Sequence, residues 1–121
     1  MKYMLLIYNN RAALEALSEQ DKAELSGDVD AIMAELGEHG EFVDGNALAD
    51  PTTAKTVRLR DGAVAATDGP FAEAKEQFAG YITVDCETEE RALEIARRWP
   101  DPRFGGAIEV RALMDQSGTE M

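Results

Sequence analysis

The sequence predicts a single α+β domain with an antiparallel sheet, and three observations support this prediction. The chain has 121 residues, the length of one domain, and 45% of them are hydrophobic, enough to bury a core. Apolar or alternating runs typical of strands occur near both ends and in the middle. Segments with the periodicity of amphipathic helices lie between them. We expect one domain over residues 1–114 and a polar, flexible tail over residues 115–121.

The first part of the chain predicts a strand, a helix and a second strand. Residues 3–8 form an unbroken apolar run, typical of a strand covered on both faces. After a connection over residues 9–17, Ser18 is a candidate N-cap for a helix that ends near Gly40. Residues 41–48 predict the second strand. The buried face of the helix is expected to hold Leu25, Val29, Ile32, Met33 and Leu36.

The second part predicts a hairpin and then another strand, helix and strand. Asp61 and Gly62 are a tight-turn signal between two alternating runs, so we expect a β-hairpin arm with one polar face. Thr88 is a candidate N-cap for a helix that Pro100 ends. The strands expected in this part cover residues 56–60, 63–67, 81–86 and 107–113.

This order of elements matches the split βαβ arrangement of ferredoxin-like folds, with the hairpin inserted between the two units. Both main helices are then expected on one face of the antiparallel sheet. The other face receives either the odd-numbered or the even-numbered side chains of residues 3–8, and so exposes a large apolar patch. Pairing two sheets face to face would cover this patch, and we therefore predict a homodimer.

Composition limits the classes of partner and cofactor. The net charge of −12 raises the cost of approaching phosphate groups, so neither nucleic acid nor an anionic membrane surface is an expected partner. Residues 1–8 do not resemble a signal peptide, and Cys86 has no cysteine to pair with, so a reducing cytoplasm is the expected location. One His and one Cys cannot build an all-protein zinc site or a Cys/His catalytic site within a single chain, and no Gly-rich phosphate loop follows a strand. We expect no metal and no cofactor.

One segment contains residue choices that neither a helix nor a strand explains. Residues 68–71 are Asp-Gly-Pro-Phe, residues 72–77 are Ala-Glu-Ala-Lys-Glu-Gln, and Gly-Tyr follows at positions 80–81. This pattern resembles the signature of the DGPF branch of the YCII-related proteins. The opening run over residues 1–8 and the Ile-Glu-Val-Arg block over residues 108–111 resemble that family's first and last strands, so the resemblance covers nearly the whole chain.

The resemblance implies a dimeric α/β barrel, a small bacterial protein without an established activity, and linkage to genes for extracytoplasmic-function sigma factors. Members of this family often carry a His shortly before the Ile-Glu-Val-Arg block, where this chain has residues 103–106 without one. Wider YCII relatives pair a His with an Asp in a pocket, and Asp68 is the counterpart of that Asp.

Asp68 is the candidate catalytic residue. Burial in a pocket would raise its pKa and make it a general acid or base near neutral pH. Alternatively, it accepts hydrogen bonds from the backbone of the following turn, with Pro70 at the first position of a short helix. The two roles are compatible if an Asp fixed by the turn still faces the pocket.

The candidate ligand-binding residues are Tyr8, Lys75, Tyr81, Glu109 and Arg111. Lys75 could contact an anionic ligand or pair across the dimer, or simply be solvated. Arg111 could bind a carboxylate with its two-pronged guanidinium, or pair with Glu109 and fix the dimer register. Tyr8 and Tyr81 could line the same cavity or pack in the core.

Two functions follow from these residues. The first is a small-molecule enzyme that uses Asp68 together with Arg111 and nearby Tyr side chains. The alternative is a non-catalytic ligand-sensing or accessory module linked to sigma-factor regulation, as the family resemblance implies.

Overall fold

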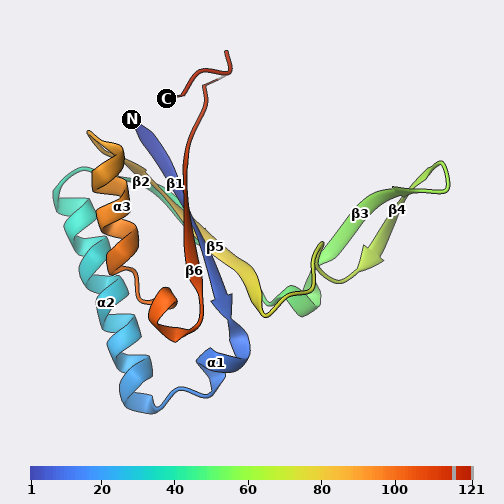
Figure 1. Cartoon of the computed structure of the whole chain (residues 1–121), viewed down its shortest axis with the longest axis horizontal. Helices are drawn as coiled ribbons and strands as arrows, with labels where there is room; N and C mark the ends of the chain where they lie inside the picture. The colour runs from blue at the N-terminus through green and yellow to red at the C-terminus, as the bar shows by residue number, and fades with distance from the viewer. Residues whose placement is uncertain (116, 121) are drawn as a thin grey trace.

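The computed structural model describes residues 1–115 and 117–120, and confirms a mixed α+β chain built on an antiparallel sheet (Figure 1). Helices α2 and α3 cover one face of the sheet, and a separate hairpin projects away from it. The elements in chain order are β1 (Lys2–Asn10), α1 (Arg11–Glu15), α2 (Glu19–Glu38), β2 (Phe42–Ala47), the 3-10 helix η1 (Pro51–Thr53), β3 (Lys55–Arg60), β4 (Ala63–Asp68), β5 (Glu76–Asp85), α3 (Glu89–Arg98), the 3-10 helix η2 (Asp101–Phe104) and β6 (Ala107–Ala112).

The four-stranded sheet has the order β2-β5-β1-β6, with every neighbouring pair antiparallel. Helix α2 joins β1 to β2, which lie on either side of β5, and α3 joins β5 to β6, which lie on either side of β1. The two strand–helix–strand units are therefore interleaved. The sheet stays open, so the described residues of one chain form no closed barrel.

Local capping sets the helix boundaries where the sequence predicted them. Ser18 Oγ accepts a hydrogen bond from the Asp21 amide at 3.1 Å, and Thr88 Oγ1 accepts one from the Arg91 amide at 3.1 Å. Gly40, just beyond the end of α2, has a φ of +66°, which suits a residue without a side chain. Both predicted N-caps are confirmed.

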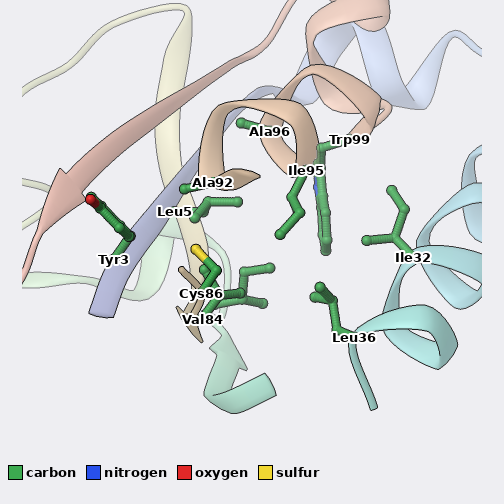
Figure 2. Close-up of a cluster of buried hydrophobic side chains, with 11 residues drawn as sticks. Tyr3, Leu5, Ile32, Leu36, Val84, Cys86, Ala92, Ile95, Ala96 and Trp99 are labelled. Atoms are coloured by element: carbon green, nitrogen blue, oxygen red, sulfur yellow. The ribbon is translucent and has the colours of Figure 1, made fainter. Parts of the chain in front are cut away.

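The core lies between the helix-facing side of the sheet and the two helices (Figure 2). The odd-numbered β1 residues Tyr3 and Leu5 are buried in it, together with Leu36 of α2 and Ile95 of α3. Because side chains alternate along a strand, the even-numbered residues of β1 lie on the opposite, outer face, where they are half-buried. The structure thus decides which set of β1 side chains belongs to the outer face.

The predicted hairpin is confirmed and stands clear of the sheet (Figure 1). Its two-residue turn uses Asp61 and Gly62 with φ of 51° and 80°, the left-handed pair that suits the twist of a hairpin. One face carries polar and charged side chains, as expected. On the opposite face, beyond the Lys55–Asp68 pair at the hairpin base, the apolar side chains of Val57, Leu59 and Val64 are 62%, 71% and 72% exposed.

The segment between β4 and β5 differs from the expected short helix at Pro70. Residues 69–75 form bends, and β5 begins at Glu76, five residues before the expected start at Tyr81. The reason is that β1 runs on to Asn10 and so offers a pairing partner to Glu76 and Gln77. The Gln77 side-chain amide also donates to the carbonyls of Ala72 and Ala74, at 3.1 and 2.9 Å, which fixes the bends without helical bonds.

Beyond β6, the chain makes a hydrogen-bonded turn in which the Asp115 carboxylate accepts from the amides of Ser117 and Thr119. The predicted domain end at residue 114 and the flexible tail over residues 115–121 stay predictions, and two residues of that tail, 116 and 121, lie outside the described part. No helix in the described residues combines the length and the hydrophobicity needed to cross a membrane.

Substitutions at two glycines, Gly106 after η2 and Gly27 of α2 as a control, test how tightly the chain after η2 packs on β1. A Cβ at Gly106 would lie 2.3 Å from the Tyr8 carbonyl oxygen, whereas a Cβ at Gly27, on the exposed side of α2, would meet nothing within 4 Å. Gly106→Ala should lower the free energy of unfolding by about 1–3 kcal/mol, the usual cost of overpacking. Gly27→Ala should raise it by roughly 0.5–1 kcal/mol through helix propensity. Urea denaturation of both variants measures this, and equal effects would contradict the contact.

Candidate functional site

Asp68 lies at the end of β4, at the base of the hairpin, rather than in a closed pocket. Its Oδ1 accepts a hydrogen bond from Lys55 Nζ at 2.5 Å across the β3–β4 pair. The side chains of Asp68 and Lys55 are 89% and 66% exposed, so solvent screens this ion pair. The structure therefore places the predicted acid in solvent next to a cation.

An open hollow of about 640 Å³ lies between the hairpin base and the start of β5. Val57, Phe71 and Phe78 give it apolar walls, and Lys55 and Glu76 are the charged residues that line it. The guanidinium of Arg58 lies over the Phe71 ring at 4.5 Å and holds that exposed aromatic in place. Lys75 is exposed in the bend segment and does not line this hollow.

The other predicted ligand-binding residues converge on the outer face of the sheet. Leu6 of β1 pairs with Tyr81 of β5 on one side and with Glu109 of β6 on the other, and Met4 pairs with Arg111. Tyr8 Oη donates a hydrogen bond to Glu109 Oε1 at 3.3 Å. Asn46 Nδ2 of β2 donates to Tyr81 Oη at 3.2 Å. These contacts join all four strands on one face, and we name Tyr8, Tyr81, Glu109 and Arg111 the outer-face cluster.

The outer-face cluster places the Arg111 cation, the Glu109 carboxylate and two phenols beside apolar surface. Arg111 is exposed and, with Met4 and Leu6, lines a hollow of about 540 Å³. Burial raises the pKa of Tyr8, and the negative charge of Glu109 raises it further, while Arg111 acts in the opposite direction. The Tyr8 phenol therefore stays protonated at neutral pH and can donate. The cluster can hold a carboxylate on Arg111 with an apolar body against Leu6.

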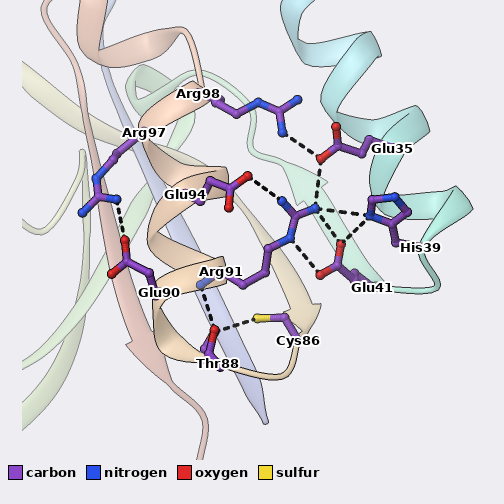
Figure 3. Close-up of polar contacts among 10 residues, drawn as sticks. All are labelled: Glu35, His39, Glu41, Cys86, Thr88, Glu90, Arg91, Glu94, Arg97 and Arg98. Atoms are coloured by element: carbon purple, nitrogen blue, oxygen red, sulfur yellow. Dashed lines mark hydrogen bonds and ion pairs between the residues drawn. The ribbon is translucent and has the colours of Figure 1, made fainter.

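A second polar cluster, which the sequence did not predict, surrounds Arg91 of α3 (Figure 3). The Arg91 guanidinium donates to both carboxylate oxygens of Glu41, at 3.0 and 2.8 Å, and to Glu35 and Glu94, at 2.9 and 3.0 Å. Arg98 donates to Glu35 at 2.7 Å. The cluster connects α3 with α2 and with the residue before β2. Arg91 is half-buried next to Ala92, which is fully buried, and the structure is needed to see this position.

The described residues contain no group of three or more His, Cys, Asp or Glu side chains arranged to hold a metal ion. Cys86 is buried, and burial raises the pKa of its thiol, which disfavours the nucleophilic thiolate.

Comparison with known proteins finds matches over nearly the whole chain. The family model described as the YCII-related domain matches residues 1–117. An uncharacterised protein of Rhizobium meliloti (strain 1021) is 33% identical over 114 residues, which cover 93% of this chain and 92% of that protein.

The Arg91 cluster predicts a specific acid dependence of stability. Hydrogen bonds from Arg98 and Arg91 lower the pKa of Glu35 from its ordinary 4.5 to about 2. Because the folded-state pKa is depressed, the stabilisation is complete above about pH 4.5 and is lost as the pH falls towards about 2. Glu35→Gln should lower stability at neutral pH and flatten its decline over this range, as measured by urea denaturation.

Glu38→Gln is the matched control, because Glu38 is an exposed acid on the same helix. Its stability should follow the pH dependence of the unmodified protein. If the stability curves of Glu35→Gln and the unmodified protein ran parallel from pH 7 to pH 2, Arg91 and Arg98 would not lower the pKa of Glu35 in the folded state.

Proposed function

The chain belongs to the family of YCII-related domains, and from this membership and the outer-face cluster we propose that it is a homodimeric small-molecule-binding protein of the DGPF branch. The observation that carries the proposal is the position of Arg111. Its exposed guanidinium lies beside the apolar side chains of Met4 and Leu6, on the face of the sheet that no helix covers. An Arg in such a setting suits a small molecule with a carboxylate and an apolar body.

The strand order β2-β5-β1-β6 supports a ferredoxin-like assignment, because each strand–helix–strand unit leaves a gap that a strand of the other unit fills. A dimeric α/β barrel extends this proposal to two chains. In it the open sheets of two copies face each other, and the outer-face cluster lies between them.

Exposed apolar surface supports the homodimer. Met4 and Leu6 are only half-buried on the outer face, and the apolar side of the hairpin carries Val57, Leu59 and Val64 in solvent. A second copy that covers these side chains would remove their apolar area from water. This burial contributes a favourable free energy of about 25 cal/mol per Å². The hairpin projects away from the sheet (Figure 1), so no element of the four-stranded sheet pairs with it.

The environment of Asp68 favours the non-catalytic, ligand-sensing alternative over acid–base catalysis. A general acid or base near neutral pH needs a pKa raised by burial or by a like charge, whereas Asp68 is exposed and paired with Lys55. The enzyme alternative would require a partner that buries Asp68 and displaces Lys55. The proposal includes a link to sigma-factor regulation, on the basis of the family resemblance. It also includes a cytoplasmic location, on the basis of the single cysteine.

In this proposal the partners of the chain are a second copy of itself and a small molecule. Nucleic acid and membranes are not among the proposed partners. The net charge of −12 supports this choice, since it opposes binding to phosphate-rich surfaces. Lys75 has no place in the outer-face cluster, and in this proposal it is a solvated surface charge.

The dimer is tested by sedimentation velocity at micromolar concentration. The unmodified protein should sediment as a dimer, and Leu6→Glu should sediment as a monomer, because a symmetric interface would bury two unpaired carboxylates. Ala31→Glu, on the exposed side of α2, is the control and should stay dimeric. A stable monomer of the unmodified protein at micromolar concentration would overturn the homodimer.

Ligand binding is tested by calorimetric titration with benzoate, which has one carboxylate and an apolar ring. Arg111→Gln should weaken benzoate binding about tenfold or more, because a charge-assisted hydrogen bond contributes about 1.5–3 kcal/mol. Arg60→Gln, on the exposed hairpin, is the matched control and should bind as the unmodified protein does. Equal affinities of the Arg111→Gln and unmodified dimers, or no binding of benzoate to either, would contradict a carboxylate site at Arg111.

A further inference from the structure

A third hollow, a cavity of about 330 Å³, lies on the helix-covered side of the sheet. Its walls are apolar, with Ile7 from β1, Val29 and Met33 from α2, and Trp99 from the end of α3. Figure 2 shows the Trp99 side chain extending between α3 and α2. Phe42, at the start of β2, also lines the cavity and is 39% exposed, so the cavity opens to solvent at this edge of the sheet.

The polar side chains of this cavity include one buried acid, Asp101. It follows the buried Pro100 and begins η2, and only 8% of its surface is exposed. The Gly106 amide donates to the Asp101 carbonyl at 3.0 Å, which ties the loop over residues 100–106 to itself. Gly106 also rests on the Tyr8 carbonyl, where a side chain would not fit. The loop is therefore held against β1, with Asp101 in the lining of the cavity.

Asp101 lacks a cation among the described residues. The nearest basic residue in sequence, Arg103, pairs with Asp28 of α2 instead. Burial is the main influence on the pKa of Asp101 and raises it, while hydrogen bonding from Trp99 and its own backbone acts in the opposite direction. A buried carboxylate without a counter-ion is costly, and an ammonium group placed beside it would offset that cost.

We propose that this cavity binds a small apolar amine, with the Asp101 carboxylate as its counter-ion. The apolar walls fit a hydrocarbon or aromatic body, and the volume lies at the lower end of the range for small-molecule sites. Asn9, on the same side of β1 as Ile7, supplies a second hydrogen-bonding group. The net charge of −12 raises the local concentration of cations.

Asp101 and Arg111 lie on opposite faces of the sheet, although Tyr81 of β5 both lines this cavity and belongs to the outer-face cluster. Side chains of Ile7 and Asn9 point to the helices, whereas those of Leu6 and Tyr8 point to the outer face. The two sites also select opposite charges. Amine binding at Asp101 therefore does not depend on the proposed carboxylate site at Arg111.

The test is calorimetric titration of the full chain with 2-phenylethylamine, and with 3-phenylpropionate as the ligand of similar shape and opposite charge. The amine should bind and the acid should not. Asp101→Asn should weaken amine binding about tenfold or more. Asp30→Asn, an exposed acid on α2, is the matched control and should leave it unchanged, as should Arg111→Gln.

A second variant covers the outcome in which Asp101→Asn does not fold, as judged by circular dichroism. Met33→Trp fills the cavity from α2 and leaves the carboxylate in place, so it should abolish amine binding while the chain stays folded. Equal binding of the amine and the acid, or unchanged amine affinity in a folded Asp101→Asn or Met33→Trp variant, would overturn the proposal.

Discussion

The structure depends on the two-residue alternation of β1, the strand that pairs with both β5 and β6. Its odd-numbered side chains enter the core, where Leu5 is almost fully buried against the two helices. Its even-numbered side chains reach the outer face. A slip of one residue in its pairing would exchange the two sets, so burial of Tyr3 and Leu5 fixes the register of the sheet. The same register places Leu6 between Tyr81 and Glu109.

Features encoded by local sequence were predictable. Ser18 and Thr88 are N-caps because their side chains reach amides three residues away, and the Asp61-Gly62 turn requires left-handed backbone. The outer-face cluster was predictable in part, because alternation along β6 places Glu109 and Arg111 on one face. Its completion by Tyr8 and Tyr81 depends on how three strands pair, which the alternation of a single strand does not reveal.

Features made by long-range contacts were not predictable in the same way. Asp68 is exposed because the hairpin stands away from the sheet, and its Lys55 partner lies 13 residues earlier in the chain. The Arg91 cluster brings together α2, α3 and the residue before β2, across 50 and 56 residues. Asp101 is an ordinary loop residue in sequence, and it becomes a buried acid only because Gly106 lets its loop close on β1.

The loop over residues 100–106 joins the residues that face the two sides of the sheet. Asp101, at its start, faces the helix-side cavity, and immediately after its end β6 begins and carries Glu109 and Arg111 to the outer face. Gly106 is the point of closest contact, because its missing side chain lets the loop rest on the carbonyl of Tyr8, whose own side chain bonds to Glu109. A side chain at this position would push the loop from β1 and disturb both faces together. The Gly106 contact thus holds the loop that carries Asp101, while the pairing of β6 with β1 places Arg111 on the other face.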